Sequence, residues 1–249
     1  MLTEETRKKL SDLRLHGFLR GLDEQRNNEE FQQLNFEDRF GLLIDREWEE
    51  RESRKLTRLL QKAKFKYPKA CLEDLSYQPS RGLNRSVVQQ LASGRWIREA
   101  QKVVITGATG CGKTYVACAL GNKACRLSYS VMYFRVQRLL QELLVARADG
   151  SVERVLTRIA KADLLILDDW GLVPFNGDNR RDMLDVIEER EAVKATMIAS
   201  QLPVAQWHDS IGEPLMADAI LDRLVHTAHR IELKGESMRK NSSTTNPGD

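Results

Sequence analysis

The sequence predicts an α/β fold, a parallel five-stranded sheet flanked by helices, with an all-α region at the N-terminus. Three observations lead to this prediction. A complete phosphate-binding loop follows an apolar run at residues 103–106. Apolar runs then alternate with helical patterns up to residue 233, and the first 66 residues contain no proline and one helical pattern after another. Strands that alternate with helices form a parallel sheet with both faces covered.

Residues 1–66 are expected to form a helical domain that binds DNA or a partner, with breaks near Gly17–Gly21 and near Asn27 and Asn28. From Arg51 to Lys69 there are eight basic residues and one acid. The basic residues that recur at helical spacing are Arg51, Arg54, Lys55, Arg58 and Lys62. A solvated helix face usually mixes charges, so this basic stripe favours a polyanion as ligand, with an ordinary exposed helix as the alternative.

The phosphate-binding loop fills the pattern GxxxxGK[ST] after a short apolar strand and before a helix. It consists of Gly107, Ala108, Thr109, Gly110, Cys111, Gly112, Lys113 and Thr114. Glycines let backbone N–H groups turn toward a phosphate, and the helix aims its positive end at the same point. Lys113 supplies a charge for the β- and γ-phosphates, and the Thr114 hydroxyl is an oxygen ligand for Mg²⁺. The pattern predicts that the chain binds a nucleoside triphosphate together with Mg²⁺.

An acid pair follows the apolar run at 164–167. Asp168 emerges where parallel sheets place ligands, and we assign it to Mg²⁺ through water. Asp169 is assigned to polarising the attacking water. The alternative is a buried strand followed by an acidic turn. A second acid favours an ATPase over a metabolic kinase, since a kinase activates an acceptor hydroxyl instead of water.

The remaining elements follow from apolar periodicity. Strands are predicted at 103–106, 131–135, 164–168, 196–200 and 230–233, and helices at 84–92, 113–127, 136–148, 151–161, 179–192 and 215–225. Residues 67–240 are therefore expected to form the nucleotide-binding domain. Phe65–Pro79, with two prolines, is predicted to be a linker, and the polar tail 241–249 to be disordered.

The composition further narrows the classes of protein to which the chain can belong. The net charge is only +3, and four cysteines show neither CxxC nor Cys/His spacing. There is no run of 18 apolar residues and no signal peptide, so we expect no membrane span and a reducing, cytoplasmic location.

The chain from about Phe65 to Lys240 resembles the AAA+ ATPases of the IstB/DnaC type, a branch of the P-loop NTPases. The matching stretches are Gly107–Thr114, Leu164–Gly171, Thr196–Gln201, Leu221–Leu224 and Gly235–Arg239. The last two, with Trp207 and the helical N-terminal region, are more similar to the IstB transposition helper than to the helicase loader. The resemblance implies ATP hydrolysis, nucleotide-dependent self-association on double-stranded DNA, and activation or recruitment of an IstA-like transposase. A DnaC-like replicative helicase loader is the alternative.

The resemblance also implies roles for single residues. Arg223 is the candidate for an arginine that touches the γ-phosphate of a neighbouring subunit, and Arg239 for a same-chain arginine that senses nucleotide. Gln201 is expected to orient water, although related proteins often carry Asn there. Arg138 and Arg147, on the helix after the second strand, are expected to contact DNA phosphates together with the basic stripe. Asp169 replaces the Glu of other AAA+ branches, which suits slow hydrolysis and a switch.

Overall fold

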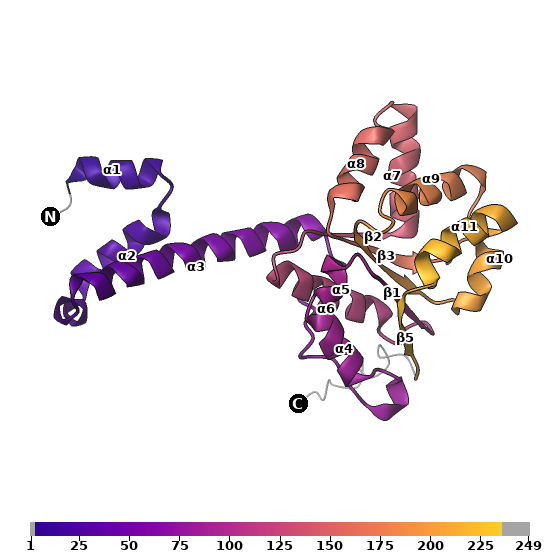
Figure 1. Cartoon of the computed structure of the whole chain (residues 1–249), viewed down its shortest axis with the longest axis horizontal. Helices are drawn as coiled ribbons and strands as arrows, with labels where there is room; N and C mark the ends of the chain where they lie inside the picture. Colours follow the sequence, from indigo (N-terminus) through magenta and orange to yellow (C-terminus); the bar gives the residue numbers. More distant parts are fainter. Residues whose placement is uncertain (1–2, 236–249) are drawn as a thin grey trace, which may run out of the picture. The chain divides into compact units, whose positions relative to one another are not determined.

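The computed structural model describes residues 3–235 and divides between Arg58 and Leu59 into two compact units. The first unit contains α1 (Glu4–Asp12), α2 (His16–Asn27), the short 3₁₀ helix η1 (Glu29–Gln33) and most of α3 (Phe36–Ala63). The second unit contains the sheet and all the other helices (Figure 1). Each unit is described by itself below.

The predicted helix break near Gly17–Gly21 lies a few residues earlier, at residues 13–15 between α1 and α2, and α2 itself runs through both glycines. The reason is packing against α3. A Cβ at Gly17 would lie 2.8 Å from the Glu47 Cα, and one at Gly21 would lie 2.9 Å from a Leu43 methyl group. The two glycines, four residues apart, let the helices approach closely. The predicted break at Asn27 and Asn28 is confirmed, since α2 ends there and the Asn28 side chain caps η1.

The second unit confirms the predicted fold class. All strand pairs are parallel, in the order β2-β3-β4-β1-β5. The strands are β1 (Lys102–Gly107), β2 (Val131–Arg135), β3 (Leu164–Trp170), β4 (Ala195–Ser200) and β5 (His229–Leu233). The order places β1, β3 and β4 in the interior of the sheet, and their carboxyl ends meet at one edge.

Helices cover both faces of the sheet (Figure 1). They are α4 (Arg85–Ala92), α5 (Arg95–Arg98), α6 (Lys113–Arg126), α7 (Val136–Ala148), α8 (Val152–Lys161), α9 (Gly177–Glu188), α10 (Trp207–Ile211) and α11 (Pro214–Val225). Leu165 and Leu167 share a core cluster with α7, α9 and α11, whereas the Ile166 side chain between them reaches α6 at Gly121. Alternate residues of β3 therefore serve opposite faces, which explains its continuous apolar sequence.

The predicted linker and the start of the helix predicted at 179–192 differ from the structure. The segment Phe65–Pro79 has no long helix, as expected, yet it is no loose linker. Phe65, Ala70 and Leu75 are buried, and the Phe65 ring packs on Tyr133 at a centroid distance of 6.4 Å. The helix expected at 179–192 begins earlier, because the Asn176 side chain caps its first turn.

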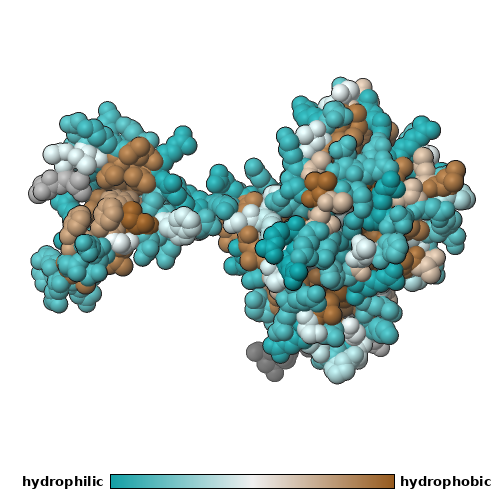
Figure 2. Space-filling model, viewed as in Figure 1, coloured by the Kyte–Doolittle hydropathy of each residue, from teal (hydrophilic) through white to brown (hydrophobic). Residues whose placement is uncertain are grey.

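The first unit carries apolar side chains at its surface, visible in Figure 2. Phe36 and Trp48 are 77% and 67% exposed, and Phe40 and Ile44 lie between them at intervals of four residues on α3. Such spacing places these side chains near one another on the helix surface. Among residues 3–235, no helix combines the length and apolar character that crossing a membrane requires.

Candidate functional site: a nucleotide pocket and two basic surfaces

The phosphate-binding loop joins β1 to α6 in a conformation that depends on its glycines. Gly107 has φ +148°, and a Cβ there would lie 2.2 Å from the carbonyl oxygen of Leu233. Gly112 has φ +96° at the N-terminus of α6. Residues that carry a Cβ rarely adopt either backbone conformation, so the path of the loop requires glycine at both positions. The loop amides and the N-terminus of α6 together form an anion-binding concavity.

Lys113 is almost buried within this loop, at 7% exposure. Its Nζ donates to the carbonyl oxygens of Gly107 and Ala108, at 2.7 and 2.8 Å. Burial lowers the pKa of Lys113, while the nearby carboxylates Asp168 and Asp169 oppose that shift. Because the hydrogen-bond acceptors of the ammonium group are uncharged, a phosphate oxygen is a stronger partner for it than either carbonyl.

The acid pair lies on an irregularity of β3. Leu167 pairs with Ile198 and Trp170 with Ser200, so β3 has one more residue than β4 across this interval. Asp169 has φ +58°, the left-handed region that Asp tolerates better than most residues. A bulge of this kind re-aims side chains at the rim of a sheet. Asp168 is 1% exposed and accepts a hydrogen bond from the Thr114 hydroxyl at 2.9 Å.

The oxygen donors at this edge fit Mg²⁺ bound together with a nucleotide. In the described part of the chain, no group of three or more His, Cys, Asp or Glu side chains is arranged to hold a metal ion. Thr114 and Asp168 instead bring one hydroxyl and one carboxylate together. Mg²⁺ keeps several waters and typically uses one or two protein oxygens plus phosphates, so this pair suffices only when phosphates complete the shell.

A cavity of about 380 Å³ opens beside the loop. Lys113, Thr114, Asp169 and Gln201 all line it, and Gln201 Oε1 accepts a hydrogen bond from the Thr109 hydroxyl at 2.6 Å. Residues from the phosphate loop, β3 and the end of β4 therefore converge, as the sequence predicts for strand ends in a parallel sheet.

Sequence reasoning missed the other wall of this cavity. Tyr67 and Tyr115 lie with ring centroids 5.9 Å apart, and the Tyr115 hydroxyl donates to Asp74 at 3.1 Å. Arg81 is buried and donates to the carbonyl oxygen of Cys111 at 2.8 Å. Tyr115 directly follows the loop motif, which was the one available signal. Tyr67 and Arg81 come from the segment interpreted as linker and from the short helix η2 (Pro79–Arg81).

The two candidate arginines of the C-terminal part are placed differently. Arg223, on α11, donates to Glu188 at 2.9 Å and to the carbonyl oxygen of Ala219 at 2.7 Å, and its side chain is 30% exposed. Its partners lie within the same chain. Arg239 lies outside the described residues.

The basic stripe lies on α3, interleaved with acids. Arg51 donates to Glu47 at 2.5 Å, Arg54 lies 3.9 Å from Glu50, and Lys55 lies 3.7 Å from Glu52. Within residues 3–235, Arg58 and Lys62 are exposed and have no carboxylate in ion-pair range. The free positive charge therefore concentrates toward the C-terminal end of the stripe.

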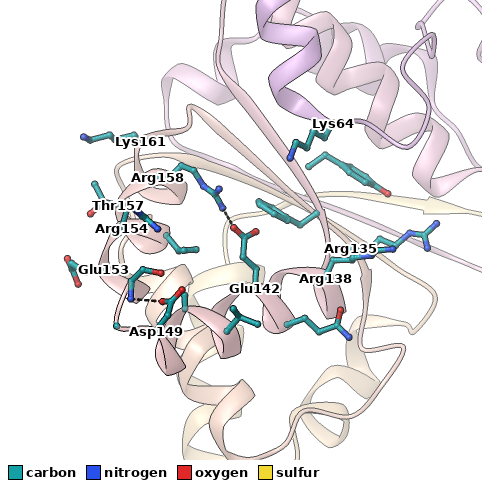
Figure 3. A pocket seen from close by; sticks show the side chains of 18 of the residues that line it. Lys64, Arg135, Arg138, Glu142, Asp149, Glu153, Arg154, Thr157, Arg158 and Lys161 are labelled. Atoms are coloured by element: carbon teal, nitrogen blue, oxygen red, sulfur yellow. Dashed lines mark hydrogen bonds and ion pairs between the residues drawn. The ribbon is translucent and has the colours of Figure 1, made fainter.

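The two arginines of α7 occupy different environments. Arg147 forms ion pairs with Asp182 and Asp185 of α9. Arg138 instead lines a groove of about 1750 Å³ with other exposed cations (Figure 3). The basic residues of this groove are Lys64, Lys66, Arg135, Arg138, Arg154, Arg158 and Lys161. Two of them have acidic partners nearby: Arg158 donates to Glu142 at 2.6 Å, and Arg135 Nε lies 3.6 Å from Asp169 Oδ2.

Comparison with known proteins identifies the family. The profile of the IstB-like ATP binding proteins matches residues 8–246. The chain belongs to this family. An insertion-sequence ATP-binding protein of Sinorhizobium fredii is 46% identical over 97% of this chain and 98% of its own length. The ATP-binding protein of insertion sequence IS1162 from Pseudomonas fluorescens is 47% identical over 82% of this chain and 88% of its own length.

Solved structures share the fold of the second unit. DnaI superimposes with a TM-score of 0.58 and 22% identity, over 72% of this chain and 94% of that one. The DnaC helicase loader gives a TM-score of 0.57 and 18% identity, over 66% of this chain and 97% of that one. The second unit of this IstB-like protein is thus an AAA+ P-loop fold, as predicted.

Proposed function

We propose that this IstB-like protein is an ATP-hydrolysing transposition helper. It binds ATP and Mg²⁺ at the phosphate loop, assembles with further copies on double-stranded DNA in the cytoplasm, and activates or recruits a partner transposase. The observation that carries the proposal is the convergence of Lys113, Thr114, Asp169 and Gln201 on one cavity, in a chain whose relatives are insertion-sequence ATP-binding proteins. Residues 67–240 are assigned to ATP chemistry and to part of the DNA contact, and residues 1–66 to DNA and partner binding.

Nucleotide binding begins with an exchange of partners at Lys113. The ammonium leaves the carbonyls of Gly107 and Ala108 and takes β- and γ-phosphate oxygens, while loop amides hold the other oxygens. Thr114 and Asp168 would hold Mg²⁺, which would neutralise charge on the phosphate oxygens. Tyr67 and Tyr115 are assigned to the base, because aromatic faces in a pocket stack well on a purine.

Water activation falls to Asp169, with Gln201 orienting the water. Arg135 Nε lies 3.6 Å from Asp169 Oδ2. The side chain of Asp169 is shorter than the Glu of other AAA+ branches, which agrees with a slow switch better than with a fast motor. The Gln201 amide already reaches the loop at Thr109, so its extra methylene relative to Asn does not keep it from the site.

Arg223 is proposed to act on the nucleotide of a neighbouring copy, where it neutralises charge that develops in phosphoryl transfer. For that, Arg223 must exchange Glu188 for the γ-phosphate. Arg223→Ala and Asp169→Asn chains should each be inactive alone and recover part of the turnover when mixed. Mixed assemblies contain interfaces at which an intact Arg223 meets an intact Asp169. No recovery in the mixture, with assemblies still forming, would exclude action in trans.

DNA binding is assigned to two basic surfaces. The α3 stripe offers Arg58 and Lys62, which have no ion-pair partner among residues 3–235, and the groove beside α7 and α8 offers Arg138 among others (Figure 3). Contacts with phosphates carry no sequence information, so binding should be largely independent of sequence and weaken steeply with salt. The exposed apolar side chains of α3 suit a protein partner, since Phe36 and Trp48 are 77% and 67% exposed.

Electron microscopy and sedimentation of the protein with duplex DNA, in ATP, in ADP and without nucleotide, test the proposal. The expected result is a larger particle on DNA with ATP alone. The same particle size in all three states would reject the nucleotide switch. Incubation of the ATP-bound assembly with the transposase, and separately with the replicative helicase, distinguishes the transposition helper from the helicase loader by which protein co-sediments.

A further inference from the structure

Tyr133 of β2 contacts Asp168, the first residue of the acid pair. Its hydroxyl donates to Asp168 Oδ2 at 2.6 Å, and the ring is buried beside Phe65. Asp168 lies on the neighbouring strand β3, and its register partner on β2 is Arg135. No sequence pattern singled out this tyrosine, because a tyrosine in a buried strand ordinarily serves packing.

The carboxylate oxygen that accepts from Tyr133 is the same one that accepts from Thr114. Asp168 Oδ2 thus receives two hydroxyl donors, at 2.6 Å from Tyr133 and 2.9 Å from Thr114. Two donors on one oxygen hold the plane and rotamer of a carboxylate far more tightly than one. Because the Thr114 hydrogen points to Asp168, the lone pairs of its oxygen remain available to a cation.

The Tyr133 hydroxyl acts as the donor in this contact, because the carboxylate oxygen that it faces is an acceptor. Phenylalanine has nearly the same shape and lacks only this donor. The side chain therefore offers a substitution that isolates one hydrogen bond.

We infer that Tyr133 is a positioning residue for Mg²⁺: through Asp168 it orients the Thr114 hydroxyl and the free carboxylate oxygen toward the metal bound with ATP. This inference rests on the proposed function. Tyr133 itself is expected to touch neither ATP nor the metal. It acts by limiting the orientations of Asp168, which matters for Mg²⁺ because this ion demands near-ideal octahedral geometry.

The test measures ATP binding by titration calorimetry or a fluorescent ATP analogue, in EDTA and at increasing Mg²⁺. Tyr133→Phe should raise about tenfold the Mg²⁺ concentration at which the effect of Mg²⁺ on ATP binding is half-maximal. This is the effect of losing one hydrogen bond to a charged group. ATP affinity in EDTA should stay within about twofold of the parent, since Lys113 and the loop amides are untouched. With Ca²⁺, which accepts flexible geometry, the shift should be clearly smaller.

Two controls separate positioning from packing. Tyr129→Phe removes a hydroxyl from a half-buried tyrosine just before β2, and Phe65→Leu removes the ring that packs on Tyr133. Both should leave the Mg²⁺ midpoint unchanged. In an Asp168→Asn background, adding Tyr133→Phe should cause no further shift, because the two changes act on one interaction.

A Tyr133→Phe midpoint equal to that of the parent overturns the inference. So does an equal loss of ATP affinity in EDTA and with Mg²⁺, or a Phe65→Leu shift as large as that of Tyr133→Phe, since either result indicates a packing role. If the parent itself shows no ATP binding and no Mg²⁺ response, the proposed function fails instead, and the two failures are thereby distinguished.

Discussion

The nucleotide pocket and the basic stripe of α3 both depend on charged side chains, but they hold them differently. In the pocket the charges are few and buried, and each has a specific partner: Lys113 on loop carbonyls, Asp168 under two hydroxyls. In the stripe the cations are many and exposed, and those that pair do so with acids on the same helix.

This difference decides how strongly each surface depends on a single residue. A buried charge left without its partner raises the free energy of the folded protein far more than an exposed one does, because water can replace the partner only at the surface. Single substitutions should therefore abolish function in the pocket, whereas the stripe should lose affinity in proportion to the charge removed.

Lys113→Ala should weaken ATP binding roughly 100-fold or more, because the β- and γ-phosphates lose their charged partner. ATP-driven assembly on DNA should disappear with it. Titration calorimetry and light scattering measure the two effects. Lys123→Ala, on the same helix but near its other end, is the matched control. An assembly that still responds to ATP in Lys113→Ala would place the nucleotide elsewhere.

Asp169→Asn should leave ATP binding within about twofold and lower turnover by about 100-fold or more, the usual contribution of a general base. The amide keeps the shape of the side chain and loses the charge that polarises water. Phosphate release measured beside ATP affinity checks both statements. Turnover at the parent rate would show that the two acids are assigned incorrectly.

The triple change of Arg54, Arg58 and Lys62 to Ala should flatten the plot of log affinity for duplex DNA against log salt. The slope should fall by about one unit for each phosphate that the protein no longer neutralises. Because Arg54 lies near Glu47 and Glu50, about two units are expected if those ion pairs persist on DNA. Fluorescence anisotropy at several salt concentrations measures the slope, and ATP binding should not change.

The matched comparison replaces Arg138, Arg154 and Arg158 of the groove by Ala. A flatter slope here, with an unchanged slope for the stripe variant, would make the stripe an ordinary solvated helix face and move DNA binding to the second unit. Equal changes in slope would support both surfaces.

Glu47→Gln should cost about 1 kcal/mol in the stability of the first unit. The Glu47 carboxylate accepts from the N–H groups of Gly17 and Phe18, at 2.8 and 3.1 Å, and from Arg51. Burial by itself raises the pKa of Glu47, but these hydrogen bonds outweigh it, so the pKa lies below the usual 4.5. Stability from Glu47 is thus complete above pH 4.5 and is lost as pH falls through the lowered pKa.

Hydrogen exchange of α2 in the full chain measures this effect at several pH values. The difference between parent and variant should be largest near pH 7 and shrink below about pH 4.5. A difference that is independent of pH would mean that packing, and not the ionised carboxylate, joins α2 to α3.

The sequence by itself was enough for the sheet, the phosphate loop and the acid pair. Each rests on a local rule: glycines where backbone must turn tightly, apolar runs where both faces are covered, and polar residues at strand ends. The role of Gln201, which directly follows the fourth predicted strand, came instead from the family resemblance. The helix limits were predicted less well where a side-chain cap such as Asn176 sets the first turn.

Packing between distant parts of the chain determines which residues without a recognisable motif reach the nucleotide site, and which cations have no acidic partner among the described residues. Tyr133 looks like any strand tyrosine until β2 pairs with β3 and brings its hydroxyl to Asp168. Arg190 is buried and donates to the carbonyls of Ile159 and Ala162, although its local sequence is that of an exposed arginine. Gly17 and Gly21 read as a helix break and instead permit close packing on α3. These outcomes depend on interactions between residues far apart in the chain, and a local pattern carries no record of them.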